Sequence, residues 1–119
     1  MNSKESLKKI VSALSNRKGE DIKVIDISKL TYFAEYFVIV HGNNAPQLEA
    51  LMDSVEESLK EDKKYPKSIE GDKNGMWILM DFGDIIVHIF NQEGREFYDL
   101  DRVWSDGVNI SLEDLLEEK

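Results

Sequence analysis

Residues 77–90 read WILMDFGDIIVHIF, and this stretch decides the fold. Two apolar runs flank the tetrapeptide DFGD at 81–84, whose glycine suits the positive φ of a tight hairpin turn. Runs of this length, rich in β-branched and aromatic residues, are typical of strands. The stretch therefore predicts two antiparallel strands, at about 76–82 and 85–90.

Upstream of the hairpin, the apolar pattern changes from helical to extended and back. Apolar residues spaced three and four apart predict a helix over about 4–16. A β-branched run at 21–28 and the wholly apolar YFVIV at 36–40 predict two strands, and we expect the second to be buried on both faces. A second amphipathic helix is expected to begin at Asn44 and Gln47, which have the spacing of a capping box.

The remaining segments complete the predicted architecture. A strand at 68–71 precedes the hairpin, a helical turn follows it at 91–101, and Ser111 caps a short acidic helix. The sum predicts a mixed β-sheet of about five strands with helices packed on it, in the α/β or α+β class. We expect one main domain over 1–107 and an acidic C-terminal extension over 108–119.

The composition is that of an acidic globular protein. The 119 residues are 41% hydrophobic and 33% charged, with 15 Lys plus Arg against 24 Asp plus Glu and a net charge of −9. Residues 61–119 carry 7 basic and 15 acidic side chains, or −8 of that charge. Such a surface repels phosphate backbones, so we expect no direct nucleic-acid readout and a basic partner that meets the second half.

Cysteine content and targeting signals restrict the chemistry and the cellular location that we expect of the protein. The chain has no cysteine, which excludes disulfides and thiolate chemistry. It shows no apolar signal segment and no apolar run long enough to span a bilayer. The sequence therefore predicts a cytoplasmic protein that does not enter a membrane.

The loop HGNN at 41–44 is the first candidate for chemistry, because a glycine between a strand and a helix points backbone N–H groups at an anion. A single glycine is a weak signal, and neither a Walker loop nor a dinucleotide fingerprint is present. A capped turn explains the loop more simply. A small nucleotide-binding or nucleotidyltransferase-like enzyme that uses Gly42 with Asp81 or Asp84 stays the alternative function.

The second candidate is a metal site at Asp81, Asp84 and His88. Asp84 lies in the turn and His88 lies about 13 Å further along a strand, at ~3.3 Å per residue, so the two cannot share an ion without a bend. The remaining pair supplies at most two ligands, whereas catalytic zinc needs three. We therefore expect no metal, no cofactor and no catalytic residue, and we assign Asp81 and His88 to hydrogen bonding within the sheet.

The alternation of side chains along the first hairpin strand leads to a surface hypothesis. Trp77 and Leu79 share one face, and the two amphipathic helices can both cover the other. An exposed aromatic and aliphatic patch with an acidic rim is typical of a protein-docking surface, and it also suits a homodimer. The acidic neighbours are Glu70, Asp72, Asp99 and Asp101. The alternative is that Trp77 belongs to the core.

The motifs that carry a family resemblance extend from the first strand to the second tryptophan. They are Asp21-Ile22, Ala34-Glu35-Tyr36-Phe37-Val38-Ile39, Gly42, Gln47, Glu70-Gly71, residues 77–90, Arg95, Phe97-Tyr98-Asp99-Leu100 and Trp104. With these motifs the chain resembles the ribosomal silencing factor family, also called the Iojap-like family, over about residues 7–104. Glu35 stands where the family usually has Asp, and Asn43-Asn44 stand in place of a Thr-Ser type pair.

The resemblance implies a translational repressor rather than an enzyme. It implies binding to the large ribosomal subunit through the subunit's fourteenth protein, a block of joining with the small subunit, and lower translation when nutrients are scarce. It also implies a fold related to nucleotidyltransferases, whose catalytic carboxylate pair has no counterpart near 41–44. By resemblance and by the surface hypothesis, the expected partner-binding residues are Glu70, Trp77, Leu79, Tyr98 and Asp99.

Overall fold

The structure, a computed structural model, describes residues 3–117 and is built on a six-stranded mixed sheet. In chain order the strands are β1 (Glu20–Asp26), β2 (Tyr36–Gly42), β3 (Ser68–Glu70), β4 (Trp77–Asp81), β5 (Ile85–Asn91) and β6 (Val108–Ile110). The helices are α1 (Ser3–Asn16), α2 (Ala45–Lys60), α3 (Gln92–Tyr98), α4 (Leu100–Val103) and α5 (Leu112–Glu117). The strand order is β3-β4-β5-β2-β1-β6, in which β2 and β5 run parallel and the other neighbours run antiparallel. The predicted mixed α+β fold is confirmed.

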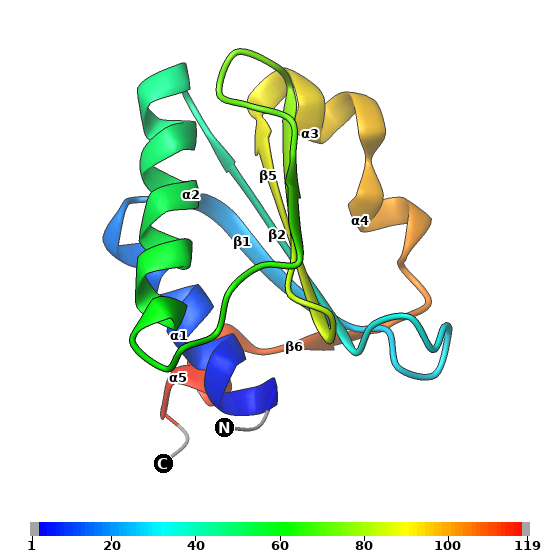
Figure 1. Ribbon diagram of the computed structural model, residues 1–119. Helices are drawn as coiled ribbons and strands as arrows, with labels where there is room; N and C mark the ends of the chain where they lie inside the picture. The colour runs from blue at the N-terminus through cyan, green and yellow to red at the C-terminus, as the bar shows by residue number, and fades with distance from the viewer. Residues whose placement is uncertain (1–2, 118–119) are drawn as a thin grey trace.

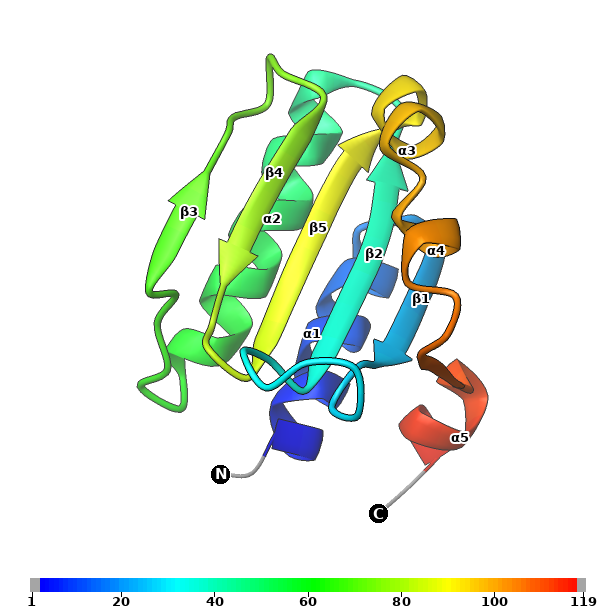
Figure 2. The same ribbon diagram turned by 90° about the vertical axis from the view of Figure 1, so that its right-hand side faces the viewer.

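Helices lie on both faces of the sheet (Figure 1). α1 and α2 cover one face, as their apolar stripes predicted, and α3 and α4 lie on the other (Figure 2). The buried apolar residues of the two long helices are Leu7, Ile10, Val11, Ala13, Leu14, Leu48, Leu51, Val55 and Leu59. The face that carries α3 and α4 is only partly covered, because both helices are short and α3 lies beside β2 and β5.

The sheet therefore has two cores, one on each face. Along β4, Ile78 and Met80 are fully buried in the larger core beneath α1 and α2, whereas Trp77 and Leu79 pack against the smaller one. The smaller core consists of Ile25, Ile27, Ala34, Phe37, Ile39, Ile86 and Phe90. The two-residue period read from the hairpin sequence thus places each β4 side chain on its predicted face.

The C-terminal segment differs from the predicted organisation. Residues 108–110 form a sixth strand, which pairs antiparallel with β1 at Val24↔Ile110 and Asp26↔Val108. The expected short helix is α5. Its Leu115 is 1% exposed and belongs to the larger core. The sheet has six strands where about five were expected. The division into a main domain over 1–107 and an extension over 108–119 stays a prediction.

Arg95 links α3 to α4 and to the end of the sheet through hydrogen bonds and ion pairs. The guanidinium is 7% exposed and makes a bidentate contact with Asp101, at 3.0 Å from Nε to Oδ2 and 3.3 Å from Nη2 to Oδ1. Its Nη1 lies 3.2 Å from His41 Nδ1, and its Nη2 lies 3.5 Å from an Asp21 carboxylate oxygen. A buried guanidinium needs acceptors for its five N–H groups, and Asp101 supplies two of them from α4.

We expect Asp101→Ala to lower the free energy of unfolding by about 2 kcal/mol. Breaking a fully buried ion pair from one side costs about 3–5 kcal/mol. The effect here is smaller because the Asp101 side chain is 24% exposed and Asp21 still faces the guanidinium. Urea unfolding measures the change. Asp106→Ala, at an exposed position nearby, is the matched control with a change below about 0.5 kcal/mol, and equal losses in the two variants would contradict the prediction.

Candidate functional site

A groove of about 430 Å³ lies on the sheet face of the smaller core, opposite α1 and α2. It is lined by Glu70, Gly71, Met76, Trp77, Leu79 and Tyr98. Four of the five side chains expected to bind a partner therefore surround one cavity, although they come from β3, β4 and α3. We call this cavity the Trp77 groove. A contact between these residues and a partner stays a prediction.

Strand register brings the walls of the Trp77 groove together. Glu70 of β3 pairs with Leu79 of β4, and Trp77 of β4 pairs with Phe90 of β5. The α3 helix begins directly after β5, because Asn91 caps it by accepting a 2.6 Å hydrogen bond from the backbone N–H of Gly94. Tyr98, the last of the seven residues of α3, packs on Trp77 at the start of β4, with ring centroids 4.6 Å apart. The groove is thus formed by local chain connections around a single hairpin.

Trp77 is neither a wholly exposed anchor nor a fully buried core residue. Its indole is partly buried and packs on the rings of Phe90 and Tyr98, with centroids 5.2 and 4.6 Å away. The remaining surface of the indole lines the Trp77 groove beside the partly buried Leu79. Tyr98 is 36% exposed, and Glu70 is also exposed. The groove therefore has an apolar floor with hydroxyl and carboxylate groups at its rim.

Asp99, the fifth expected contact residue, does not line the Trp77 groove. It lies at the junction of α3 and α4, where a φ of +47° breaks the two helices apart. Its carboxylate lies 3.3 Å from Nε of Arg102 on the next turn. Asp99 therefore already faces a cation of its own chain, and its position sets the direction of α4.

The sequence argument missed the role of His88, which supports the Trp77 groove from beneath. Its imidazole is 3% exposed, and Nδ1 accepts a 3.1 Å hydrogen bond from the indole Nε1–H of Trp77. Burial lowers the pKa of His88 to about 4. The side chain does form a hydrogen bond within the sheet, but its partner is another side chain. The signal was present in the hairpin register, which places His88 opposite Leu79 and on the same face as Trp77.

Gly71 lines the Trp77 groove at a point where only glycine fits. Its φ is +83°, and a Cβ atom there would lie 2.0 Å from the carbonyl oxygen of Trp77. We expect Gly71→Ala to lower the free energy of unfolding by more than about 1 kcal/mol, because the new methyl group meets rigid backbone. Gly75→Ala in the same loop is the matched control, since its Cβ would meet only Asp72 O at 3.6 Å. Thermal unfolding measures both, and a tolerated Gly71→Ala would contradict the geometry.

The loop at 41–44 is filled by the chain itself. The backbone N–H of Asn43 donates to Gln47 Oε1 at 2.7 Å, and Asn44 Oδ1 accepts from the Gln47 N–H at 2.8 Å. Gln47 Nε2 in turn donates to Lys18 O at 3.0 Å. A Cβ on Gly42 would lie 3.1 Å from Gln47 Oε1. The amide of Asn43 in the loop and the amide of Gln47 in the first turn of α2 are therefore engaged in the capped turn that was the simpler explanation.

The acidic candidates for a metal site are likewise engaged separately. Asp81 Oδ1 accepts a 2.7 Å hydrogen bond from the Gly83 N–H within the hairpin turn. Asp84 lies 3.4 Å from Lys64 Nζ, at the other side of the turn. Within the described part of the chain, no three His, Asp or Glu side chains are grouped as a metal site would require.

None of the described helices combines the length and the hydropathy needed to cross a bilayer.

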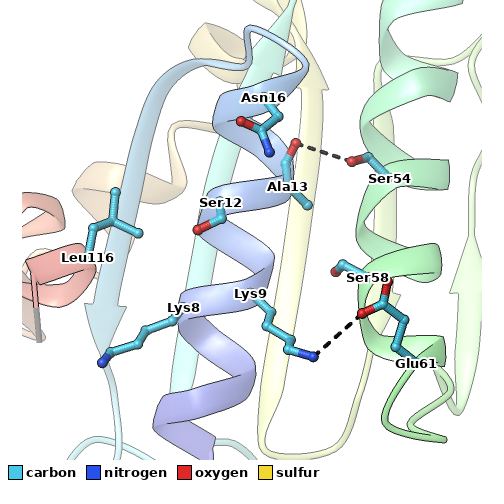
Figure 3. A pocket seen from close by; sticks show the side chains of 9 residues that line it. All are labelled: Lys8, Lys9, Ser12, Ala13, Asn16, Ser54, Ser58, Glu61 and Leu116. Atoms are coloured by element: carbon cyan, nitrogen blue, oxygen red, sulfur yellow. Dashed lines mark hydrogen bonds and ion pairs between the residues drawn. The ribbon is translucent and has the colours of Figure 1, made fainter. Parts of the chain in front are cut away.

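A second groove lies on the other side of the molecule, between α1 and α2 (Figure 3). Ser54 Oγ of α2 donates to the carbonyl oxygen of Ala13 in α1, at 3.2 Å. Lys9 of α1 lies 3.9 Å from Glu61 and forms a hydrogen bond with Asp62. These polar groups face one another across the groove, as Figure 3 shows for Lys9 and Glu61. They join the two helices and are not arranged toward a common ligand.

Comparison with known proteins decides the family. A family model described as "Ribosomal silencing factor during starvation" matches residues 1–119. The chain belongs to the ribosomal silencing factor family. A ribosomal silencing factor from Bacillus subtilis is 34% identical over 113 residues, which cover 95% of this chain and 96% of that protein. The resemblance stated from the sequence motifs is thereby confirmed.

Solved structures of ribosomal silencing factor relatives agree with the fold. A crystal structure of a Chromobacterium violaceum protein superposes with a TM-score of 0.85 at 35% identity, covering 93% of this chain and 92% of that one. A Bacillus halodurans structure gives a TM-score of 0.79 at 27% identity, covering 90% and 97%. Membership of the ribosomal silencing factor family gives the chain a ribosome-associated silencing role, which is regulatory in kind.

Proposed function

We propose that this chain represses translation by binding the large ribosomal subunit through its fourteenth protein and by sterically blocking the small subunit, above all when nutrients are limiting. The observation that carries the proposal is the Trp77 groove, in which partly buried Trp77 and Leu79 form the floor and Glu70 and Tyr98 stand at the rim. The groove is a surface for a protein partner, and the proposed activity makes or breaks no bond.

The apolar floor suits an anchored protein contact. Interfaces derive most of their binding free energy from a few aromatic or Arg side chains, which lie in a desolvated centre within a polar rim. Trp77 and Tyr98 are aromatic residues of this kind, and the centroids of their rings lie 4.6 Å apart. Because Trp77 is already packed on Phe90, little side-chain freedom is lost when a partner covers it.

Charge supports a basic protein rather than RNA as the partner. The second half of the chain carries −8 of the net −9 charge, and it includes the exposed Glu70 at the groove rim. Ribosomal proteins are typically basic, whereas the RNA around them is polyanionic. The acidic surface therefore attracts an exposed basic protein surface and disfavours contact with the phosphate backbone.

Steric exclusion follows from the size of the bound body. The molecule extends over 34 × 33 × 27 Å, so a copy bound at the face between the subunits occupies space that their bridging contacts need. No step of this mechanism consumes a substrate. Inhibition is therefore proportional to the fraction of large subunits that carry the protein.

Gradient sedimentation tests the proposal. The purified chain is mixed with isolated large and small subunits, and we expect it to move with the large subunit and to reduce the fraction of joined particles in proportion to its occupancy. Undiminished joining at saturating protein would overturn the steric mechanism. Magnesium-dependent nucleoside triphosphate binding that is lost on Gly42→Ala would instead support the alternative enzyme.

Two further expectations belong to the proposal. The cytoplasm is the proposed place of action, since the subunits that the chain would bind meet there. The open groove also predicts a homodimer of the free protein, which would bury Trp77 until the ribosome competes for it. Analytical ultracentrifugation over a range of concentrations checks the dimer.

A further inference from the structure

We infer that His88 is a positioning residue of the Trp77 groove, which holds the indole of Trp77 in the orientation that partner binding uses. The inference rests on the proposed function, because the groove is the same. His88 itself is 3% exposed, so its side chain offers almost no surface to a partner. It acts through the hydrogen bond that its Nδ1 accepts from Trp77 Nε1–H at 3.1 Å.

The imidazole is itself held in one orientation. His88 lies on β5 opposite Leu79 of β4, and Trp77 lies two residues earlier on that strand, so both rings project from the same face of the sheet. The ring of Phe37 from β2 packs edge-on against the imidazole, with centroids 4.6 Å apart and an interplanar angle of 72°. Neighbouring strands therefore fix the acceptor before any partner arrives.

The other nitrogen of His88 shows that the residue does not serve packing alone. If Nδ1 accepts from the indole, the neutral ring carries its proton on Nε2. Nε2 is buried and has no hydrogen-bond partner among the residues that the structure describes. A buried donor without a partner is unfavourable, and an aliphatic side chain would avoid it. The neighbours of His88 on this face of β5, Ile86 and Phe90, are indeed apolar.

The imidazole accepts a hydrogen bond from Trp77, which an aliphatic side chain at position 88 could not do. An indole has one polar edge, so a bond from Nε1 selects one orientation of the ring among those that packing allows. The ring of Tyr98 packs on the same indole, with centroids 4.6 Å apart, and Tyr98 also lines the groove. An anchor that is already oriented loses less freedom on binding, which strengthens the complex. Burial keeps His88 neutral near physiological pH, so Nδ1 remains available as an acceptor.

Two substitutions of His88 separate positioning from packing. His88→Leu removes the acceptor and the unpartnered Nε2–H together, whereas His88→Asn keeps an acceptor oxygen near the position of Nδ1. We expect His88→Leu to bind isolated large subunits about fivefold to tenfold more weakly, which corresponds to one lost hydrogen bond, while it unfolds at the same urea concentration or higher. His88→Asn should recover most of the affinity. The indole N–H proton of Trp77 should move upfield in the NMR spectrum of His88→Leu only.

A double-mutant cycle tests whether His88 acts through the indole. Trp77→Phe keeps an aromatic ring but removes Nε1–H, so adding His88→Leu to Trp77→Phe should cause no further loss of affinity. Additive losses would overturn the inference. Ile86→Val, on the same face of β5, is the matched control for a small change in packing, and it should bind like the wild type.

The outcomes distinguish the inference from the proposed function. If the wild-type chain does not bind large subunits, both fail. If the wild type binds and His88→Leu binds equally well, only the role of His88 is wrong. If His88→Leu loses stability and affinity together and Asn restores neither, His88 is merely structural and the inference fails.

Discussion

Trp77→Ala is expected to weaken binding to the large ribosomal subunit by about thirtyfold or more. Truncating a central interface anchor costs about 2 kcal/mol or more, and each 1.4 kcal/mol is tenfold in affinity. Alanine removes the largest aromatic surface of the Trp77 groove and the ring that packs on Phe90 and Tyr98. A binding titration on isolated large subunits measures the loss directly.

The controls for Trp77→Ala separate a lost contact from a lost fold. Tyr65 is 57% exposed and does not line the Trp77 groove, so Tyr65→Ala should bind like the wild type. Leu79→Ala should weaken binding in the same direction. Circular dichroism and urea unfolding show whether each variant is folded. If Trp77→Ala unfolds while Leu79→Ala folds and binds normally, the aromatic floor is part of the core and not a docking surface.

His88 is expected to lower the stability of the protein by about 3 kcal/mol as the pH drops from about 7 to about 4. Burial lowers the pKa of His88 to about 4, whereas the ordinary value of 6.5 applies in the unfolded chain. Between these two pH values the unfolded chain takes up a proton that the folded chain refuses, so the free energy of unfolding decreases as the pH falls. The size follows from 1.36 kcal/mol for each pH unit of that window.

Urea unfolding of the wild type and of His88→Leu over this pH range checks the size and the source of the effect. The variant lacks the titrating group, so its stability should fall by about 3 kcal/mol less than that of the wild type over the same interval. Asp84 acts at lower pH. Burial would raise the pKa of Asp84, but the hydrogen bond from Ser3 and the charge of Lys64 bring it below its ordinary 3.8, so its stabilisation is lost below that pH. Parallel pH profiles of the two proteins would refute the assignment to His88.

The sequence predicted the parts of the fold in which one chemical pattern dominates. The hairpin over 77–90 could be predicted because turn chemistry and two strand periods agree, and the stripe of α2 because apolar residues repeat over four turns. The strand at 108–110 escaped prediction, since three residues with two exposed carry no periodic signal. The break between α3 and α4 at Asp99 depends on a positive φ in a residue that is not glycine, and the sequence alone does not show it.

The candidate site was predictable to the same extent. Trp77 and Leu79 followed from alternation along one strand, Glu70 was named as an acidic neighbour of that face, and the family motif added Tyr98. The cluster could therefore be named before its geometry was known. Hydrogen bonding of His88 within the sheet was predicted, but its partner was not, because which nitrogen of an imidazole meets which neighbour depends on side-chain torsions. The displacement of Asp99 from the groove has the same origin in a local backbone angle.

The pairing of β6 with β1 determines how a C-terminal truncation would behave. A chain cut at Gly107 would leave the outer edge of β1 without its ladder of hydrogen bonds and would uncover the surface on which Leu115 packs. Bare edges of this kind join to one another between molecules, and the result is aggregation. A shortened version would therefore precipitate or form edge-to-edge multimers, and its failure in a binding assay would say nothing about the ribosome.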